Sequence, residues 1–122
     1  MITGAFDRDE ARIPLKLQGP RGERQIEAVI DTGYSGTLTL PRKLIKDLGL
    51  AWHTFDRSVL ADGSECLFDV FTASVIWDGR VRRILIDEAD IEPLVGIRLM
   101  KDYELRIVVR RNGKVTLKRL TR

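Results

Sequence analysis

The most informative segment of the sequence is Ala28-Val29-Ile30-Asp31-Thr32-Gly33-Tyr34-Ser35-Gly36. An apolar strand runs directly into Asp31-Thr32-Gly33, so the Asp31 carboxylate stands at the end of a buried strand and is held rigidly. Gly33 lets the backbone turn tightly beneath it. Thr32 offers a hydroxyl that can brace the loop, and free backbone N–H groups can bond the carboxylate and tune its pKa. Taken alone, the motif also fits a plain strand-ending turn with Asp31 as a cap.

On both sides of this stretch apolar residues alternate with polar ones, as they do in half-buried strands. Three Asx-Gly pairs, at 62–63, 78–79 and 112–113, predict tight turns between the strands. A short helix is predicted to begin at Pro41 and to end at Gly49, and one or two further turns are predicted over 97–103. The predicted strands centre on 13–17, 26–30, 38–40, 67–75, 81–86, 105–109 and 115–120.

These elements predict an all-β fold, a small and mostly antiparallel closed barrel with one or two short α-helices. The length of 122 residues, with 43% hydrophobic and 32% charged residues, favours a single domain over 1–122. Its first residues, about 1–11, are expected to form a frayed end, with an autolysis site as the less favoured reading.

Composition also bears on cofactors and compartment. The single histidine, His53, cannot build a His-rich metal site, and we expect neither a metal nor another cofactor. The single cysteine, Cys66, cannot form an internal disulfide, which favours a reducing, cytoplasmic setting. We see no membrane-spanning stretch and no signal peptide, so no membrane partner is expected.

Positive charge is concentrated in residues 97–122, which hold nine Lys or Arg and only two acids. Such a segment could bind nucleic acid or an acidic surface. A solvated outer face on terminal strands, where charge deters edge-to-edge aggregation, is the favoured alternative. Only Tyr103 could stack on bases there, so nucleic acid is disfavoured as a partner.

With its surroundings included, the sequence resembles the retropepsin-like aspartic proteases, and their small prokaryotic members more closely than the viral ones. Four features match in order along roughly residues 12–120. They are the apolar strand with Asp31-Thr32-Gly33, the strand and helix over 37–49, a hairpin with Ala61-Asp62-Gly63-Ser64 at its tip, and Leu94-Val95-Gly96 followed by a short helix over 97–103.

The resemblance implies an aspartic endopeptidase in which Asp31 is catalytic. Two carboxylates must share one proton for this chemistry. The chain has one Asp-Thr-Gly, so the pair would come from a symmetric homodimer with a protein or peptide substrate. Thr32 and Gly33 would form the active-site loop. Ala61, Asp62, Gly63 and Ser64 would form a flap over the substrate. Leu94, Val95 and Gly96 would support the loop from beneath.

The sequence departs from the family pattern at several positions. Tyr34 follows Asp-Thr-Gly and could line or restrict the pocket. Ile97 separates Gly96 from Arg98, whereas viral enzymes carry the arginine that ties their dimer directly after the glycine. Viral enzymes also build their dimer interface from the C-terminal strand, which would bury 115–120 here. The acids Asp87, Glu88, Asp90 and Glu92 are interpreted as a solvated loop. The main alternative function is a non-catalytic peptide-binding or dimerisation module on the same fold.

Overall fold

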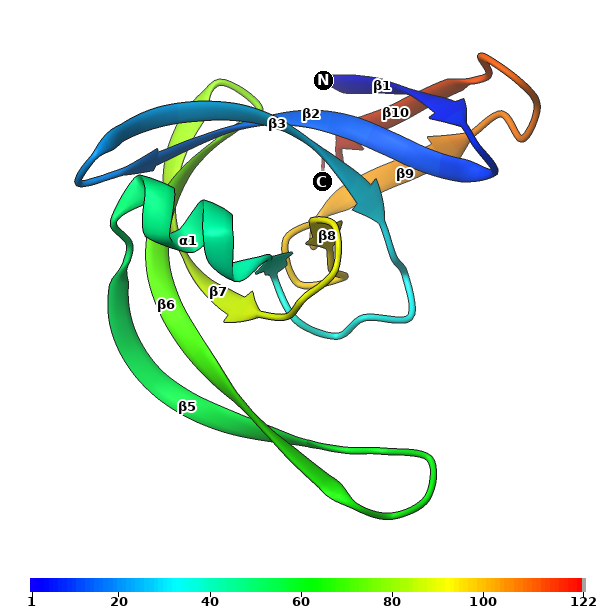
Figure 1. Cartoon of the computed structure of the whole chain (residues 1–122). Coiled ribbons are helices and arrows are strands. Elements are labelled where there is room, and N and C mark those ends of the chain that lie inside the picture. Colours follow the sequence, from blue (N-terminus) through cyan, green and yellow to red (C-terminus); the bar gives the residue numbers. More distant parts are fainter. Residues whose placement is uncertain (122) are drawn as a thin grey trace.

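The computed structural model describes residues 1–121 and contains, within that range, one helix and ten strands (Figure 1). In chain order they are β1 (Ile2–Asp7), β2 (Glu10–Gly19), β3 (Gly22–Ile30), β4 (Leu38–Leu40), α1 (Arg42–Leu48), β5 (Ala51–Val59), β6 (Glu65–Trp77), β7 (Arg80–Glu88), β8 (Leu94–Val95), β9 (Tyr103–Ile107) and β10 (Lys114–Arg119). The predicted all-β class is confirmed.

All strands belong to one sheet with the order β5-β6-β7-β4-β8-β3-β2-β1-β10-β9. An additional pairing of β6 with β2 closes the six strands from β6 to β2 into a ring. The pairings are antiparallel except β3 with β8 and β4 with β7, which are parallel. The predicted closed, mostly antiparallel barrel is therefore present.

The core fills this ring with the residues that the alternating pattern places inward. Ile13 and Leu17 of β2 and Leu38 and Leu40 of β4 are completely buried, with Val75 and Ile86 from the neighbouring strands. Helix α1 covers one side of the ring with Leu44, Ile45 and Leu48. As predicted, it ends at Gly49, whose φ of 65° is left-handed and whose N–H bonds the carbonyl of Lys46.

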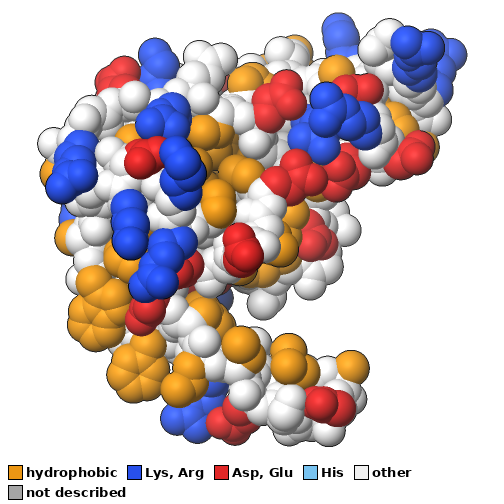
Figure 2. Space-filling model, in the orientation of Figure 1, with side chains coloured by type: hydrophobic (Ala, Val, Ile, Leu, Met, Phe, Trp, Pro, Cys, Tyr) orange, Lys and Arg blue, Asp and Glu red, His pale blue; other side chains and the backbone are white. Residues whose placement is uncertain are grey.

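Two extensions leave the ring (Figure 1). Strands β5 and β6 form a long hairpin that projects from the body and curves beneath it. On the opposite side β1, β10 and β9 continue the sheet beyond β2. The molecule is consequently open on one side, between the β5–β6 hairpin and the body (Figure 2).

The N-terminal segment corrects one prediction. Residues 1–11, expected to be a frayed end, contain β1, which pairs with both β10 and β2. Ile2 and Phe6 also pack against the core. The sequence signal was weak because the strand of six residues carries few large apolar side chains, and its stability comes from neighbours at both sides.

Two further predictions differ in detail. Residues 97–103 form hydrogen-bonded turns and the start of β9, and no second helix is present within 1–121. The apolar alternation did not predict strand β5, because no residue of it is buried. Only the hairpin implied by the resemblance, with 61–64 at its tip, required a strand there. Within 115–120, Leu117 is buried but Leu120 is 56% exposed.

Candidate active site

Asp31 directly follows β3, which lies between β2 and β8. Its backbone N–H donates to the carbonyl of Val95 at 3.0 Å, and its carbonyl accepts from the N–H of Tyr34 at 3.1 Å. Its carboxylate oxygen Oδ1 accepts from the N–H of Gly33 at 2.9 Å. Asp31 is partly exposed, and its carboxylate is hydrogen-bonded to a tight turn, as its sequence context predicts.

Leu94, Val95 and Gly96 lie against this loop. Val95 is completely buried, and β8 pairs with β3 on one side and β4 on the other. At Gly96 a Cβ would collide with the backbone carbonyl of Gly36 and would approach Cδ2 of Tyr34 to 2.8 Å. The structure therefore brings the 94–96 segment and the 31–36 loop into direct contact, which only a glycine at position 96 permits.

The residues Ala61, Asp62, Gly63 and Ser64 form the tip of the β5–β6 hairpin. Oδ1 of Asp62 accepts hydrogen bonds from the backbone N–H and the hydroxyl of Ser64, at 2.8 and 2.6 Å. These two bonds lower the pKa of Asp62 below its ordinary value. Gly63 adopts a φ of 86°, which completes the tight turn. The structure does not bring these four residues to Asp31; they lie at the far end of the projecting hairpin (Figure 1).

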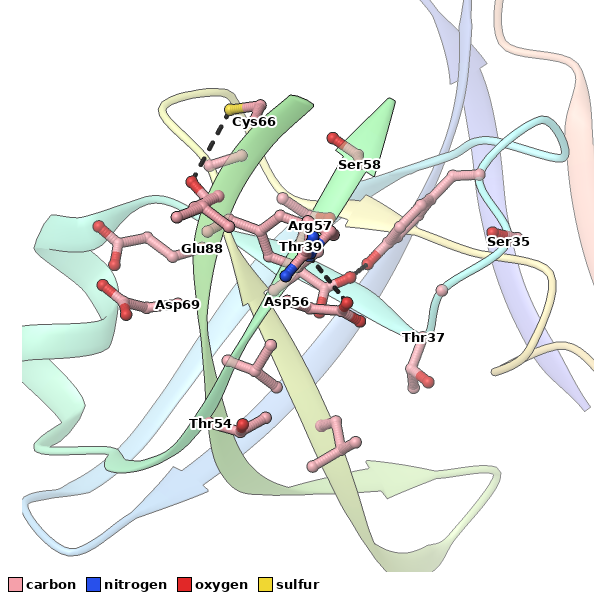
Figure 3. A pocket seen from close by; sticks show the side chains of 18 of the residues that line it. Ser35, Thr37, Thr39, Thr54, Asp56, Arg57, Ser58, Cys66, Asp69 and Glu88 are labelled. Atoms are coloured by element: carbon pink, nitrogen blue, oxygen red, sulfur yellow. Dashed lines mark hydrogen bonds between the residues drawn. The ribbon is translucent and has the colours of Figure 1, made fainter. Parts of the chain in front are cut away.

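Between the hairpin and the body lies a cleft of about 1110 Å³. Most of its lining comes from the loop that follows the Asp31 turn, from both strands of the β5–β6 hairpin and from the end of β7 with the residues directly after it (Figure 3). Thr39 of β4, Arg42 of α1 and Arg98 complete it. Ser35 and Thr37 lie on the loop, while Asp56, Ser58 and Cys66 come from the hairpin. The lining begins at Tyr34, so Asp31, Thr32 and Gly33 stand beside the cleft instead of in its wall.

A hydrogen bond between Tyr34 and Asp87 crosses the floor of this cleft. The Tyr34 hydroxyl donates to Oδ2 of Asp87 at 2.6 Å, so the residue after Asp-Thr-Gly is anchored to the end of β7. Burial, together with this bond, raises the pKa of Tyr34 well above its ordinary value. Burial also raises the pKa of Asp87; the nearby Asp56 carboxylate adds to the rise, while Tyr34 and Arg98 oppose it.

Asp87 was missed as a functional candidate. The interpretation of the acids at 87–92 as a solvated loop is wrong for Asp87 and Glu88, which end β7 and line the cleft. Glu88 also bonds Arg42 at 3.5 Å, and Glu92 bonds Arg12 at 3.1 Å. The available signal was position: Asp87 directly follows the buried Ile86, just as Asp31 follows β3.

The cleft carries charged side chains of both signs. Its acids are Asp56, Asp69, Asp87, Glu88 and Asp90, and its arginines are Arg42, Arg57 and Arg98.

No group of three or more His, Cys, Asp or Glu side chains within 1–121 is arranged to hold a metal ion. Within the same residues no helix is long and apolar enough to cross a membrane.

We compared the sequence and the structure with those of known proteins. No family model matches the sequence, and no curated protein matches it. Among solved structures, the crystal structure of a retropepsin-like aspartic protease from Rickettsia conorii matches with a TM-score of 0.62. The match covers 94% of this chain and 86% of that chain, at 20% sequence identity.

The fold is that of the retropepsin-like aspartic proteases. The architecture inferred from Asp31-Thr32-Gly33 and its neighbours is confirmed at the level of the fold. At 20% identity the match bears on the fold alone, so the roles of Asp31, of the hairpin tip and of a second chain remain predictions.

Proposed function

We propose that this chain is an aspartic endopeptidase that acts as a symmetric homodimer, with Asp31 of each copy forming a catalytic pair. The observation that carries the proposal is the placement of Asp31 in a retropepsin-like fold. Its carboxylate is hydrogen-bonded to the N–H of Gly33 and is adjacent to a cleft of about 1110 Å³.

The chemistry follows from two carboxylates in one site. Like charges about 3 Å apart do not both ionise at neutral pH, so the pair shares one proton. The ionised Asp31 takes a proton from a water molecule, which attacks the carbonyl carbon of the scissile bond. The protonated Asp31 of the second copy donates its proton to the carbonyl oxygen. The tetrahedral intermediate then collapses with protonation of the leaving amine.

Other residues would prepare the site. Thr32 would bond across the dimer axis, and Gly33 would present the inner face of the cleft. The hairpin tip at 61–64 would close on the substrate and exclude water. Leu94, Val95 and Gly96 would hold the loop in place. The cytoplasm remains the expected location, because the chain has one cysteine.

The test is cleavage of a diverse peptide mixture by the wild type and by Asp31→Asn, read by mass spectrometry at high protein concentration across roughly pH 4 to 7. Cleavage by the wild type that vanishes in the variant is the expected result. Asp31→Asn keeps the side-chain size and an acceptor for the Gly33 N–H, so its folding serves as the control. Cleavage by both proteins would contradict the role of Asp31. Cleavage by neither, with both folded and peptide retained, would favour the non-catalytic peptide-binding module.

A further inference from the structure

The floor of the cleft contains a row of residues from four neighbouring strands, and directly paired residues share one face of a sheet. Thr39 of β4 pairs with Asp87 of β7. Val70 of β6 pairs with Asp87 on one side and with Thr54 of β5 on the other. All four residues line the cleft, and Thr39 and Thr54 stand at the two ends of the row (Figure 3). Only β8 separates β4 from β3, which leads into Asp31, so the Thr39 end is the one nearer to the Asp31 loop.

The side chain of Tyr34 covers this Thr39 end of the row. Its hydroxyl donates to Oδ2 of Asp87 at 2.6 Å, and the side chain of Thr39 approaches the same hydroxyl. Thr39 is only 4% exposed, so almost none of its surface is open to the cleft. The phenol ring, instead of the sheet, therefore forms the floor at the end nearer to Asp31.

The ring of Tyr34 is also held in place along its length. A Cβ at Gly36 would lie 2.5 Å from the hydroxyl oxygen, and a Cβ at Gly96 would lie 2.8 Å from Cδ2, so two glycines make room for the ring. The N–H of Tyr34 donates to the carbonyl of Asp31 at 3.1 Å, and its carbonyl accepts from the N–H of Ile97 at 2.9 Å. A ring fixed at its backbone and at its hydroxyl cannot swing aside for a ligand without breaking one of these bonds.

We propose that Tyr34 determines substrate specificity: its ring fills the end of the cleft beside Asp31, so the peptide residue that lies over the ring must have a small side chain, such as glycine, alanine or serine. This rests on the proposed function, because it requires a peptide in the cleft. A large side chain at that position has to displace the ring, which leaves the half-buried Asp87 carboxylate without its donor. The free energy lost in this way is a penalty against large residues at one position near the scissile bond.

The test is the cleavage-site profile of a diverse peptide mixture, mapped by mass spectrometry for the wild type, Tyr34→Phe and Tyr34→Ala. In the wild type one position near the scissile bond is expected to exclude aromatic and other large side chains. Tyr34→Ala uncovers the space above Thr39, so peptides with a large side chain at that position should gain at least about tenfold in kcat/KM relative to those with a small one. Tyr34→Phe keeps the ring and should keep the exclusion.

A second variant separates specificity from folding. Tyr34→Ala loses the packing against Gly36 and Gly96, whereas Tyr34→Leu keeps an apolar contact with both glycines and still removes the ring. Tyr34→Leu is expected to admit side chains of intermediate size, and circular dichroism shows which variants are folded. If Tyr34 were only structural, each variant would lower the cleavage of every peptide by the same factor.

An unchanged size preference in the folded variants would overturn the inference. A wild type that accepts aromatic residues at every position near the bond, or a Tyr34→Phe variant that gains them, would overturn it as well.

Peptide retention separates this inference from the proposed function. The same mixture is offered to Asp31→Asn and to Asp31→Asn/Tyr34→Ala, and the retained peptides are identified. If nothing is cleaved but the retained peptides change from small to large side chains at one position, the endopeptidase proposal fails and this inference stands. If the wild type cleaves and the profile does not change, only the function stands. If no peptide is cleaved or retained, both fail.

Discussion

The Asp31 loop and the β5–β6 hairpin border the same cleft, but they are built in opposite ways. The loop is fixed by the backbone hydrogen bonds from Asp31 to Val95 and from Gly96 to Thr37, and by the close approach of Gly36 to Gly96. The hairpin has no buried residue over β5, which pairs with β6 alone. Valines mark the contrast, since Val95 is completely buried and Val59 is 70% exposed. A site that binds a polymer must keep its reacting groups in place and still open to admit the chain. A rigid Asp31 loop beside a β5–β6 hairpin with few packing contacts meets both requirements.

Glycine substitutions give the largest expected difference between the two regions. Gly96→Ala places a methyl group on the carbonyl of Gly36, and neither backbone can move without displacing the loop. We expect a loss of about 3–5 kcal/mol in the free energy of unfolding. Gly63→Ala is the matched control: its Cβ meets nothing within 4 Å, and only its φ of 86° is strained. A loss of about 1 kcal/mol is expected there. Urea denaturation measures both, and equal losses would contradict the contrast.

Two valine substitutions sharpen the comparison without changing backbone freedom. Val95→Ala removes two methyl groups from the closed core between β3 and β4 and is expected to lower the free energy of unfolding by about 2–3 kcal/mol. Val59→Ala removes the same atoms from an exposed strand, and a change within about 0.5 kcal/mol is expected. A comparable loss at both sites, measured by thermal or urea unfolding, would mean that the hairpin packs more tightly than its exposure indicates.

Tyr34→Phe tests the hydrogen bond that joins the loop to β7 and has the smallest expected effect. The ring stays, but Asp87 loses its donor, and we expect a loss of about 1 kcal/mol at neutral pH. The pKa of Tyr34 is raised by folding, so its stabilisation is complete below about pH 10 and is lost as the pH rises beyond that value. The alkaline fall in stability should therefore be smaller in the variant than in the wild type. Tyr103, whose pKa is also raised, supplies the remaining fall.

If stability falls equally with alkaline pH in the variant and the wild type, folding does not raise the pKa of Tyr34, which would contradict this prediction. The same variant should also raise the pKa of Asp87 further, because the bond from Tyr34 lowers it. The loss of stability caused by Tyr34→Phe should therefore shrink as the pH falls through the pKa of Asp87, because folding favours the protonated carboxyl; this is the second signature, measured in the same titration.

The sequence predicted the parts of the molecule where one pattern has one physical solution. Alternation placed Ile13, Leu17, Leu38 and Leu40 in the core, and Pro41 with Gly49 bounded α1. The alternation of apolar residues could not predict β5 or β1. The first buries nothing, and the second depends on partners from distant parts of the chain.

For the candidate site, the sequence predicted the residues that are neighbours along the chain. It did not predict those that only the fold brings together. Asp31, Thr32 and Gly33 are adjacent in sequence, and the position of Val95 beneath them followed from the family pattern. The bond from Tyr34 to Asp87 joins residues 53 positions apart. Only the parallel pairing of β4 with β7 brings them together, and no local signal encodes that pairing. The closing of residues 61–64 over Asp31 stays a prediction.

The central claim, that one site is made from Asp31 of two copies, is tested most directly by mixing. Wild-type protein is held at a fixed concentration at which dimers predominate, and Asp31→Asn protein is titrated in while peptide cleavage is measured. Random exchange between copies places half of the wild-type chains in mixed dimers at equal amounts, so activity should fall to about half, and to about a quarter at a threefold excess of the variant. Activity that stays constant throughout the titration would contradict the account, because it would show that a single Asp31 is sufficient.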